Sequence, residues 1–278
     1  MLKRCRLVFR QKHPYRFLAS RLLMLARVSH FLRIERGKYR LIFFPTALSA
    51  SLWVDPDNRL DEELFLARWL RPGDTAVDVG ANIGSITLAM AASVGPSGKI
   101  LSLEPHARLY THLVKNIRFN GAHHVLAAQT AAGNVEGVIG LSDLKSDDEN
   151  SVITSPARLT VPIVQLDKLA PPGRIRLIKI DVEGYEPAVL AGARQALART
   201  DIVYFEASPT FLARQGFEWN DTATLLREAG FKLMERSADG LVALADNLDR
   251  RKMVFAVRPM ILSERALERP TSSCARAE

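Results

Sequence analysis

Short apolar runs alternate with segments of helical periodicity along most of the chain. The apolar, often β-branched runs predict buried strands, at residues 40–44, 49–54, 76–79, 99–103, 125–132, 138–141, 159–165, 175–180, 202–205, 231–235 and 252–257. Apolar positions at helical spacing predict helices over residues 60–70, 83–92, 107–120, 187–199 and 222–229. Because strands and helices alternate, we predict an α/β fold built on a mostly parallel, doubly wound sheet. Pro162 predicts that its strand lies at a sheet edge.

The first part of the chain has a different pattern. Residues 15–34 are periodic in the manner of one amphipathic helix, with an apolar side formed by Leu18, Leu22, Leu25, Val28 and Leu32. Of the 38 Lys and Arg residues, twelve fall within residues 1–40, which contain one acid, Glu35. We therefore divide the chain into a basic helical arm (1–38), a catalytic domain (39–262) and a polar tail (263–278), which we expect to be disordered.

Three interpretations of the arm remain open. Its helix packs on the main domain, lies on an anionic lipid surface, or holds nucleic acid. The arm lacks aromatic residues interleaved for base stacking, which disfavours nucleic acid. The apolar run at residues 22–26 is too short for a membrane span or a secretory signal.

Overall composition adds little to this picture. The chain has 278 residues, of which 47% are hydrophobic and 24% charged, typical of a globular protein. The two cysteines, Cys5 and Cys274, form neither a metal-binding spacing nor a disulfide framework. This fits a reducing compartment, so we expect a cytoplasmic protein, with membrane association through the arm as an open alternative.

Residues 76–104 predict one β-α-β unit with a nucleoside-binding crevice. Gly80 and Gly84 bracket a tight turn after the first strand, and Glu104 ends the second strand, where an acid binds ribose hydroxyls. Asn82 replaces the middle glycine of the dinucleotide pattern, and Asp78 would repel a pyrophosphate. Such a carboxylate suits the sulfonium of S-adenosylmethionine better than NAD.

Four acids lie at the carboxyl ends of predicted strands, where open α/β sheets bind ligands. They are Asp78, Glu104, Asp181 and Glu206. A divalent metal at Asp181 and Glu206 is conceivable, but no histidine or third carboxylate makes it specific, and we assign no metal. The polar, turn-rich residues 142–158 predict a loop, either over the active site or a plain surface loop.

Several of these runs together resemble the FkbM family of S-adenosylmethionine-dependent methyltransferases. The matching runs are Val77-Asp-Val-Gly-Ala-Asn-Ile-Gly84, Leu103-Glu-Pro-His106, Lys115-Asn116 with Asn120, Leu166-Asp167 and Ile178-Lys-Ile-Asp-Val-Glu-Gly-Tyr-Glu186. The resemblance covers about residues 40–260. It implies a Rossmann-like class I methyltransferase fold and O-methylation of a hydroxyl on a carbohydrate, glycolipid or secondary metabolite.

The resemblance also implies roles for individual residues. The turn from Gly80 to Gly84 would hold the methionine end of the cofactor, and Glu104 its ribose. Where the family often has an acid near the adenine, this chain has Gly133-Asn134. Asn134 would then accept a hydrogen bond from the adenine amino group.

Methyl transfer to a neutral hydroxyl needs a general base. Asp181, at the end of the strand beside the cofactor strand, is the first candidate and Glu183 the second. Lys179 lies on the same side of its strand as Asp181 and would orient the carboxylate or the substrate. Helix N-terminal capping is the alternative role of the two acids.

Two other functions remain as alternatives to O-methylation. RNA methylation would use the basic arm, but amino-group methylases commonly carry an [ND]-P-P-[YF] run where this chain has Asp181-Val-Glu-Gly184. A non-catalytic module that binds S-adenosylmethionine is a third class. We expect a small-molecule or glycan acceptor and disfavour nucleic acid as a partner.

Overall fold

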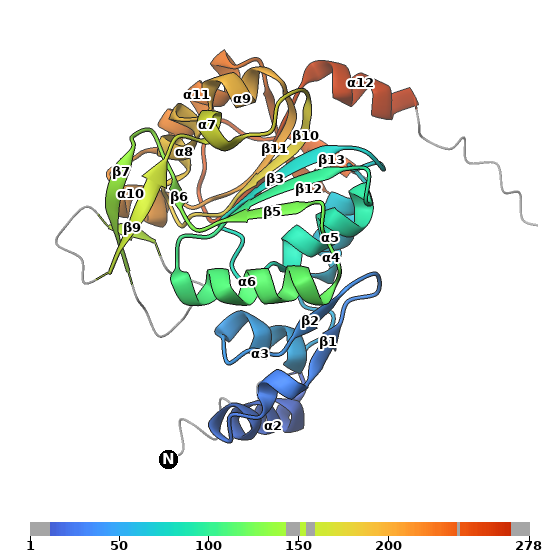
Figure 1. The fold of residues 1–278 in the computed structure, drawn as a ribbon. Helices are drawn as coiled ribbons and strands as arrows, with labels where there is room; N and C mark the ends of the chain where they lie inside the picture. Colours follow the sequence, from blue (N-terminus) through green and yellow to red (C-terminus); the bar gives the residue numbers. More distant parts are fainter. Residues whose placement is uncertain (1–11, 143–150, 154–158, 238–239, 268–278) are drawn as a thin grey trace, which may run out of the picture.

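A central sheet of eight strands organises the part of the chain that the structure describes (Figure 1). The computed structural model describes residues 12–142, 151–153, 159–237 and 240–267. The order of the sheet is β13-β12-β14-β11-β10-β3-β4-β5. These strands are β3 (Thr75–Val79), β4 (Lys99–Leu103), β5 (Val125–Ala128), β10 (Ile175–Ile180), β11 (Thr200–Ala207), β12 (Lys232–Ser237), β13 (Gly240–Ala243) and β14 (Lys252–Val257). The five strands from β11 to β5 are parallel and the rest antiparallel, which confirms the predicted mostly parallel α/β fold.

Helices cover both faces of this sheet. Alternate residues of each strand point to opposite faces, so Val77 and Ile178 belong to one apolar core and Ala76 and Leu177 to the other. The first core packs under α8 (Glu186–Ala191), α9 (Arg194–Ala198) and α11 (Trp219–Glu228), and the second over α4 (Leu60–Ala67), α5 (Ser85–Val94) and α6 (Ala107–Phe119). α7 (Leu166–Leu169) and α10 (Pro209–Arg214) are single short helices on the first side.

The predicted helix over residues 187–199 is two helices, α8 and α9. Gly192 separates them, and a Cβ at this position would lie 1.9 Å from the main-chain oxygen of Gly133. The Asp167 carboxylate accepts hydrogen bonds from the backbone N–H groups of Gln195 and Ala196 and so caps the second helix. The prediction of one continuous helix was wrong because this close backbone approach is a long-range contact.

A second, four-stranded sheet stands beside the carboxyl ends of the central strands. Its order is β6-β9-β7-β8, with β6 (Ala131–Ala132), β7 (Gly137–Leu141), β8 (Val152–Ile153) and β9 (Leu159–Val164). The strand predicted over 125–132 is therefore two strands in different sheets. The edge position predicted for β9 was also wrong, because β9 lies between β6 and β7. Pro162 is tolerated since β6 pairs only with Ile163 and Val164.

The first part of the chain forms a small layer beside α6. It consists of α2 (Pro14–Leu25), a 3-10 turn η1 (Ser29–Phe31), the hairpin β1 (Arg33–Glu35) and β2 (Arg40–Ile42), and α3 (Ala47–Val54). The single helix predicted over 15–34 was wrong: Arg27 adopts a left-handed conformation with φ of 57° just after α2. Residues 49–54, predicted as a strand, are helical, with Thr46 capping α3 by accepting from Ser49 N.

The hairpin joins this layer to the main domain. Arg36 at its turn is buried and forms an ion pair of 2.7 Å with Glu63 of α4. Ile34 and Leu41 lie in the same apolar core as α5. The predicted boundary at residue 38 thus falls inside a hairpin, and only the segment before β1 stands apart as an arm.

The last described element is α12 (Pro259–Leu267). Residues 263–267, which we expected to be part of a disordered tail, are helical, and Ile261 is buried in the second core. Residues 268–278 lie outside the described part of the chain. Among the described residues, no helix has the length and apolar character that a membrane crossing requires.

Candidate active site

The glycine turn after β3 is shaped by contact with the next strand. Gly80 has a φ of 78°, and a Cβ there would lie 1.9 Å from the main-chain oxygen of Asp181. No side chain fits such a contact, so glycine lets β10 end directly beside the turn. Asn82 adopts a positive φ of 52°, and its side-chain oxygen accepts from the N–H of Ile83. Asparagine tolerates this conformation because of such local hydrogen bonds.

Glu104 follows β4 and is tied to the same turn. Its Oε2 accepts from Asn82 N at 2.7 Å and its Oε1 accepts from His106 N at 2.9 Å. The residue is buried. Burial raises the pKa of Glu104 to about 7, opposed by the two backbone hydrogen bonds. An acid that sequence spacing alone suggested is thus fixed against the glycine turn by backbone donors.

Lys179 of β10 connects the turn with the strand ends. Its Nζ donates to Gly80 O at 2.8 Å and lies 3.1 Å from Asp78 Oδ1 and 3.6 Å from Asp181 Oδ2. Asp78 and Lys179 are register partners on neighbouring parallel strands, which places their side chains on one face. Thr87 of α5 donates a hydrogen bond of 2.6 Å to Asp78 Oδ2. This network holds the turn in place.

Three carboxylates meet at the ends of β10 and β11. Oxygen atoms of Asp181, Glu183 and Glu206 lie within 4.8 Å of one another. The guanidinium of Arg251 supplies positive charge, with Nε 2.6 Å from Glu206 and Nη2 3.8 Å from Glu183. Burial, followed by the charges of Asp181 and Glu206, raises the pKa of Glu183 to about 8. Burial likewise raises the pKa of Glu206. From the sequence we identified no third carboxylate beside Asp181 and Glu206. In the structure Glu183 is that third carboxylate.

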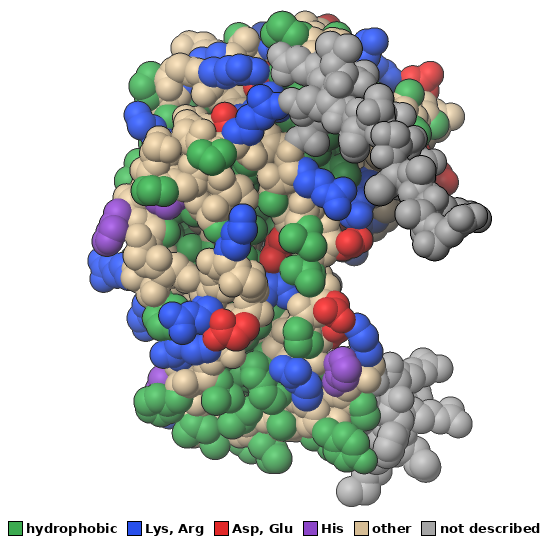
Figure 2. Space-filling view, turned by 90° about the vertical axis from the view of Figure 1, so that its right-hand side faces the viewer, with side chains coloured by type: hydrophobic (Ala, Val, Ile, Leu, Met, Phe, Trp, Pro, Cys, Tyr) green, Lys and Arg blue, Asp and Glu red, His purple; other side chains and the backbone are tan. Residues whose placement is uncertain are grey.

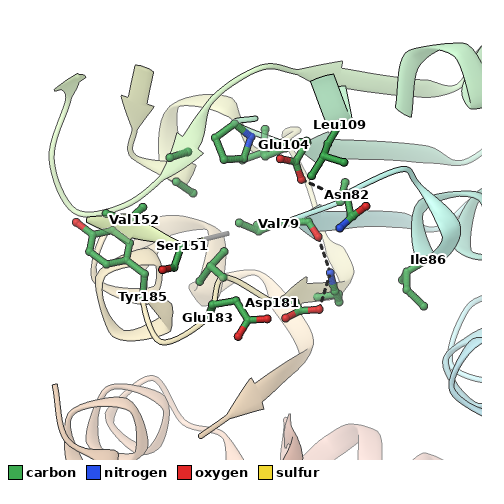
Figure 3. Close-up of a pocket in the computed structure, with 18 of the residues that line it drawn as sticks. Val79, Asn82, Ile86, Glu104, Leu109, Ser151, Val152, Asp181, Glu183 and Tyr185 are labelled. Carbon is green, nitrogen blue, oxygen red and sulfur yellow. Dashed lines mark hydrogen bonds and ion pairs between the residues drawn. The ribbon is translucent and has the colours of Figure 1, made fainter. Parts of the chain in front are cut away.

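Asp181 and Glu183 line a cavity at the carboxyl ends of the parallel strands, together with Asn82 and Glu104 (Figure 3). The space that its walls enclose is about 70 Å³, and the wider hollow of about 850 Å³ includes open solvent. Figure 3 shows Glu104 and Asn82 on one side, with Asp181 and Glu183 across the space. The arrangement separates a ribose-binding type of acid from a pair of acids suited to proton transfer.

Six of the nine residues selected from the sequence line this cavity. They are Gly80, Asn82, Glu104, Lys179, Asp181 and Glu183. Asp78 is fully buried beneath the turn, paired with Lys179. Gly84 lies behind the turn at the start of α5, where a Cβ would meet Leu113. Asn134 is exposed and does not line the cavity.

Other cavity residues were not selected from the sequence. Arg59, at the start of α4, has a left-handed φ of 59° and lies in a turn-rich run that signals only a loop. Thr130, between β5 and β6, lines the cavity on the Glu104 side of the sheet. Tyr185 lies within the Asp181–Glu186 motif and was open to selection on that ground. Arg251 does not line the cavity but pairs with Glu183, and it was also missed because it sits in a run of charges typical of a solvated surface.

The loop predicted over 142–158 is only partly described. Residues 143–150 and 154–158 lie outside the described residues. Ser151 and Val152 line the cavity, and Val152 belongs to β8, which pairs with β7. The described part of this segment is thus a wall of the cavity and contains a short strand.

The sheet order, the glycine turn and the acid after β4 together define a class I S-adenosylmethionine-dependent methyltransferase domain. Residues 78–233 match the family model of the methyltransferase FkbM domain. The chain belongs to the FkbM methyltransferase family, and the family's cofactor is S-adenosylmethionine. The resemblance inferred from the motifs is confirmed.

Individual relatives are more distant. Protein-L-isoaspartate O-methyltransferase 1 of Arabidopsis thaliana is 30% identical over 40% of this chain and 48% of its own length. The Caenorhabditis elegans protein-L-isoaspartate O-methyltransferase is 32% identical over 43% of this chain and 52% of its own. The chain thus spans about half the length of these relatives. The crystal structure of methyltransferase FkbM from Methylobacillus flagellatus KT matches with a TM-score of 0.43 and 15% identity, covering 75% of this chain and 54% of that one.

Proposed function

We propose that the protein transfers the methyl group of S-adenosylmethionine to a hydroxyl of a carbohydrate, glycolipid or secondary metabolite. The observation that carries this proposal is the position of Asp181 and Glu183 across one cavity from Glu104. Two acids at the end of β10 provide a base for a hydroxyl proton. The acid after β4 provides the ribose contact.

The residues around the turn fit the cofactor. An ionised carboxylate offers about four acceptor positions, and backbone N–H groups use two of those on Glu104. Positions remain for ribose hydroxyls. The carboxylates of the cavity also compensate a cationic ligand. When bound, S-adenosylmethionine supplies a methyl group on a sulfonium, already activated for displacement.

The chain's own contribution is alignment and proton removal. Holding two reactants in line supplies up to about 7–11 kcal/mol of a barrier. Asp181 remains our first candidate for the base, because it lines the cavity and its carboxylate is held by the Lys179 ammonium at 3.6 Å. Glu183 is the second, and its raised pKa makes it a stronger base once it is ionised. Lys179 is a positioning residue that orients Asp181 and the turn.

The acid cluster favours a neutral acceptor. The relatives in Arabidopsis and C. elegans are named for O-methylation of isoaspartate in proteins. A carboxylate acceptor would enter beside Asp181, Glu183 and Glu206 and would be repelled by those of them that are ionised. It would also need no base. A hydroxyl needs the base and meets no repulsion, so we rank it first and retain the isoaspartyl carboxyl group as the second candidate.

The test uses methyl-labelled S-adenosylmethionine, the purified full chain and a fractionated lysate. We expect base-stable label in a glycan, lipid or small-metabolite fraction. Methyl esters hydrolyse in mild alkali, whereas methyl ethers do not, so base-labile label in protein would transfer the assignment to a carboxyl acceptor. Label removed by ribonuclease would assign the reaction to RNA. Cofactor binding without label in any fraction would favour the non-catalytic alternative.

A further inference from the structure

Helix α2 exposes one apolar side to solvent. Tyr15, Leu18, Leu22 and Leu25 recur at helical spacing on one side, and all four are exposed, Leu22 by 66%. Phe31 of η1 extends this surface and is also exposed. We call these five residues the arm face. Figure 2 shows hydrophobic side chains gathered at the lower end of the molecule, where α2 lies in Figure 1.

The arm face is not the side by which α2 attaches to the protein. Ser20, on the opposite side of the helix, is buried, and Leu23 and Met24 pack against the second core. Arg16 lies over the ring of Trp53 of α3, 5.0 Å from its centroid. The helix therefore uses one side to dock on α3 and leaves a second apolar side uncovered by the described residues.

The segment that carries this face contains positive charge and no negative charge. Residues 12–34 contain Lys12, Arg16, Arg21, Arg27 and Arg33 and no acid. All five are exposed. Lys12 is paired with Asp55 and Asp57 at 3.1 Å, whereas no acid lies in the helix beside Arg21. An apolar stripe within a basic border matches an anionic lipid surface, where apolar side chains enter the acyl boundary and cations meet head groups.

We propose that the arm face docks the protein on a bilayer that contains anionic phospholipid. Charge complementarity favours a lipid surface over a second copy of this chain. The arm of a second copy is also basic and would repel the first. Three of the five arm-face residues are leucines, which suit an acyl boundary and offer no ring for base stacking, so we rank a lipid surface above RNA. The docking inference does not depend on the proposed reaction.

Docking would bring the cavity near the bilayer. Helix α3, on which α2 packs, contributes Leu48 to the cavity wall. If the acceptor is a glycolipid, as one class within the proposed function, its hydroxyl would then reach the cavity from the lipid surface. This last step rests on the proposed function, whereas vesicle binding itself is measured without any turnover.

The test is co-sedimentation of the full chain with vesicles of phosphatidylcholine, with and without phosphatidylglycerol. We expect binding to the anionic vesicles that weakens as salt is raised, because exposed charges are screened. Leu22→Glu combined with Leu25→Glu should weaken binding at least about tenfold, since two apolar side chains no longer enter the acyl boundary. Arg21→Gln should weaken it about fivefold, because one cation at an anionic surface contributes about 1 kcal/mol.

Matched controls lie on the other end of the molecule. Leu126 and Val138 are exposed by 66% and 71% on β5 and β7, and changing both to Glu adds the same two charges away from α2. This variant should bind vesicles nearly as the wild type does. All variants should retain cofactor binding by calorimetry, which shows that they are folded.

Three results would overturn the proposal. One is equal binding of the wild type and the Leu22/Leu25 variant. Another is equal binding to neutral and anionic vesicles, which would remove the role of the basic border. The third is a dimer in sedimentation velocity that the Leu22/Leu25 variant dissolves, since that would assign the arm face to a second copy.

Discussion

The carboxylates beside the glycine turn and those at the ends of β10 and β11 are held by different partners. At the glycine turn, Glu104 accepts two backbone N–H groups, and Asp78 accepts from Thr87 and lies 3.1 Å from the buried Lys179 ammonium, although its Oδ1 has no hydrogen-bond partner in the described structure. At the ends of β10 and β11, Glu183 and Glu206 share one half-exposed arginine, and each has a buried oxygen without a hydrogen-bond partner in the described structure. Carboxylates held by backbone donors or by a buried ammonium are fixed in place, while carboxylates that share one half-exposed cation are more available to take a proton or bind polar substrate atoms.

The largest expected effect comes from Asp181→Asn. An amide cannot take the acceptor's proton, so kcat should fall about 10²–10⁴-fold while cofactor affinity is retained. The measurement is methyl transfer under saturating cofactor, once an acceptor fraction is known. Asp249→Asn is the matched control, because this carboxylate is exposed and lies outside the cavity. Full activity in Asp181→Asn, with loss in Glu183→Gln, would move the role of base to Glu183.

Lys179→Met should test the ion pair that holds Asp78 below the glycine turn. Lys179 is 4% exposed, and its removal leaves Asp78 buried without a cation. Losing one partner of a buried pair costs about 3–5 kcal/mol. Arg251→Met is the comparison, since Arg251 is 50% exposed and solvent screens its pair with Glu206, so we expect a smaller loss of stability than for Lys179→Met. Urea unfolding of both variants measures the difference. Equal losses would contradict the contrast between the two groups of carboxylates.

Glu104→Ala should weaken S-adenosylmethionine binding by about 1.5–3 kcal/mol, the range for hydrogen bonds to a charged group. Isothermal calorimetry measures this directly. Asn134→Ala is the informative companion, because Asn134 is exposed outside the cavity and its substitution should leave the affinity unchanged. A loss of affinity in Asn134→Ala would restore the adenine role expected from the motif. An unchanged affinity in Glu104→Ala would remove Glu104 from the cofactor site.

Per pH unit, the smallest expected effect is on the pH dependence of stability. The pKa of Glu183 rises from 4.5 to about 8, chiefly through burial. Between these values the folded state retains a proton that the unfolded state has lost. The associated stabilisation is complete below about pH 4.5 and is lost as the pH rises to about 8.

Glu183→Gln lacks this proton. Relative to the wild type, its free energy of unfolding should therefore increase across this pH window, by at most about 1.4 kcal/mol per pH unit. Above about pH 8 the difference between the two proteins should stay constant. Urea unfolding over a pH series gives the comparison. Parallel curves for the two proteins would show that Glu183 is not buried as the structure describes.

Local patterns explain why much of the region around the glycine turn was predictable. A glycine turn between a strand and a helix, and an acid at the end of the next strand, are contained within residues 76–104. Each depends on backbone conformation over a few residues, which sequence encodes directly. Asp181 and Glu183, which were selected because both follow a strongly apolar strand, line the cavity, and their catalytic role stays a prediction.

Long-range packing explains the misses. Arg251 immediately precedes β14, and it reaches Glu206 only because β14 is paired antiparallel with β11. Asp78 was expected to face the ligand, but its register partner Lys179 draws it into the core. The apolar side of α2 was recognised from the sequence. The end of the helix before Arg27 and the exposure of its apolar side to solvent were not.

The sequence by itself determined the alternation of strands and helices, the glycine turn, the acid after β4 and the membership of a methyltransferase family. These properties are set by periodicity and by residues near one another in the chain. Tertiary structure alone decided that Asp181, Glu183 and Glu206 form one cluster, that Asp78 is buried, and that α2 turns its apolar side outward. The reason is that register and docking orientation arise from contacts between distant segments, and a one-residue shift in either would send the same side chains to the opposite face.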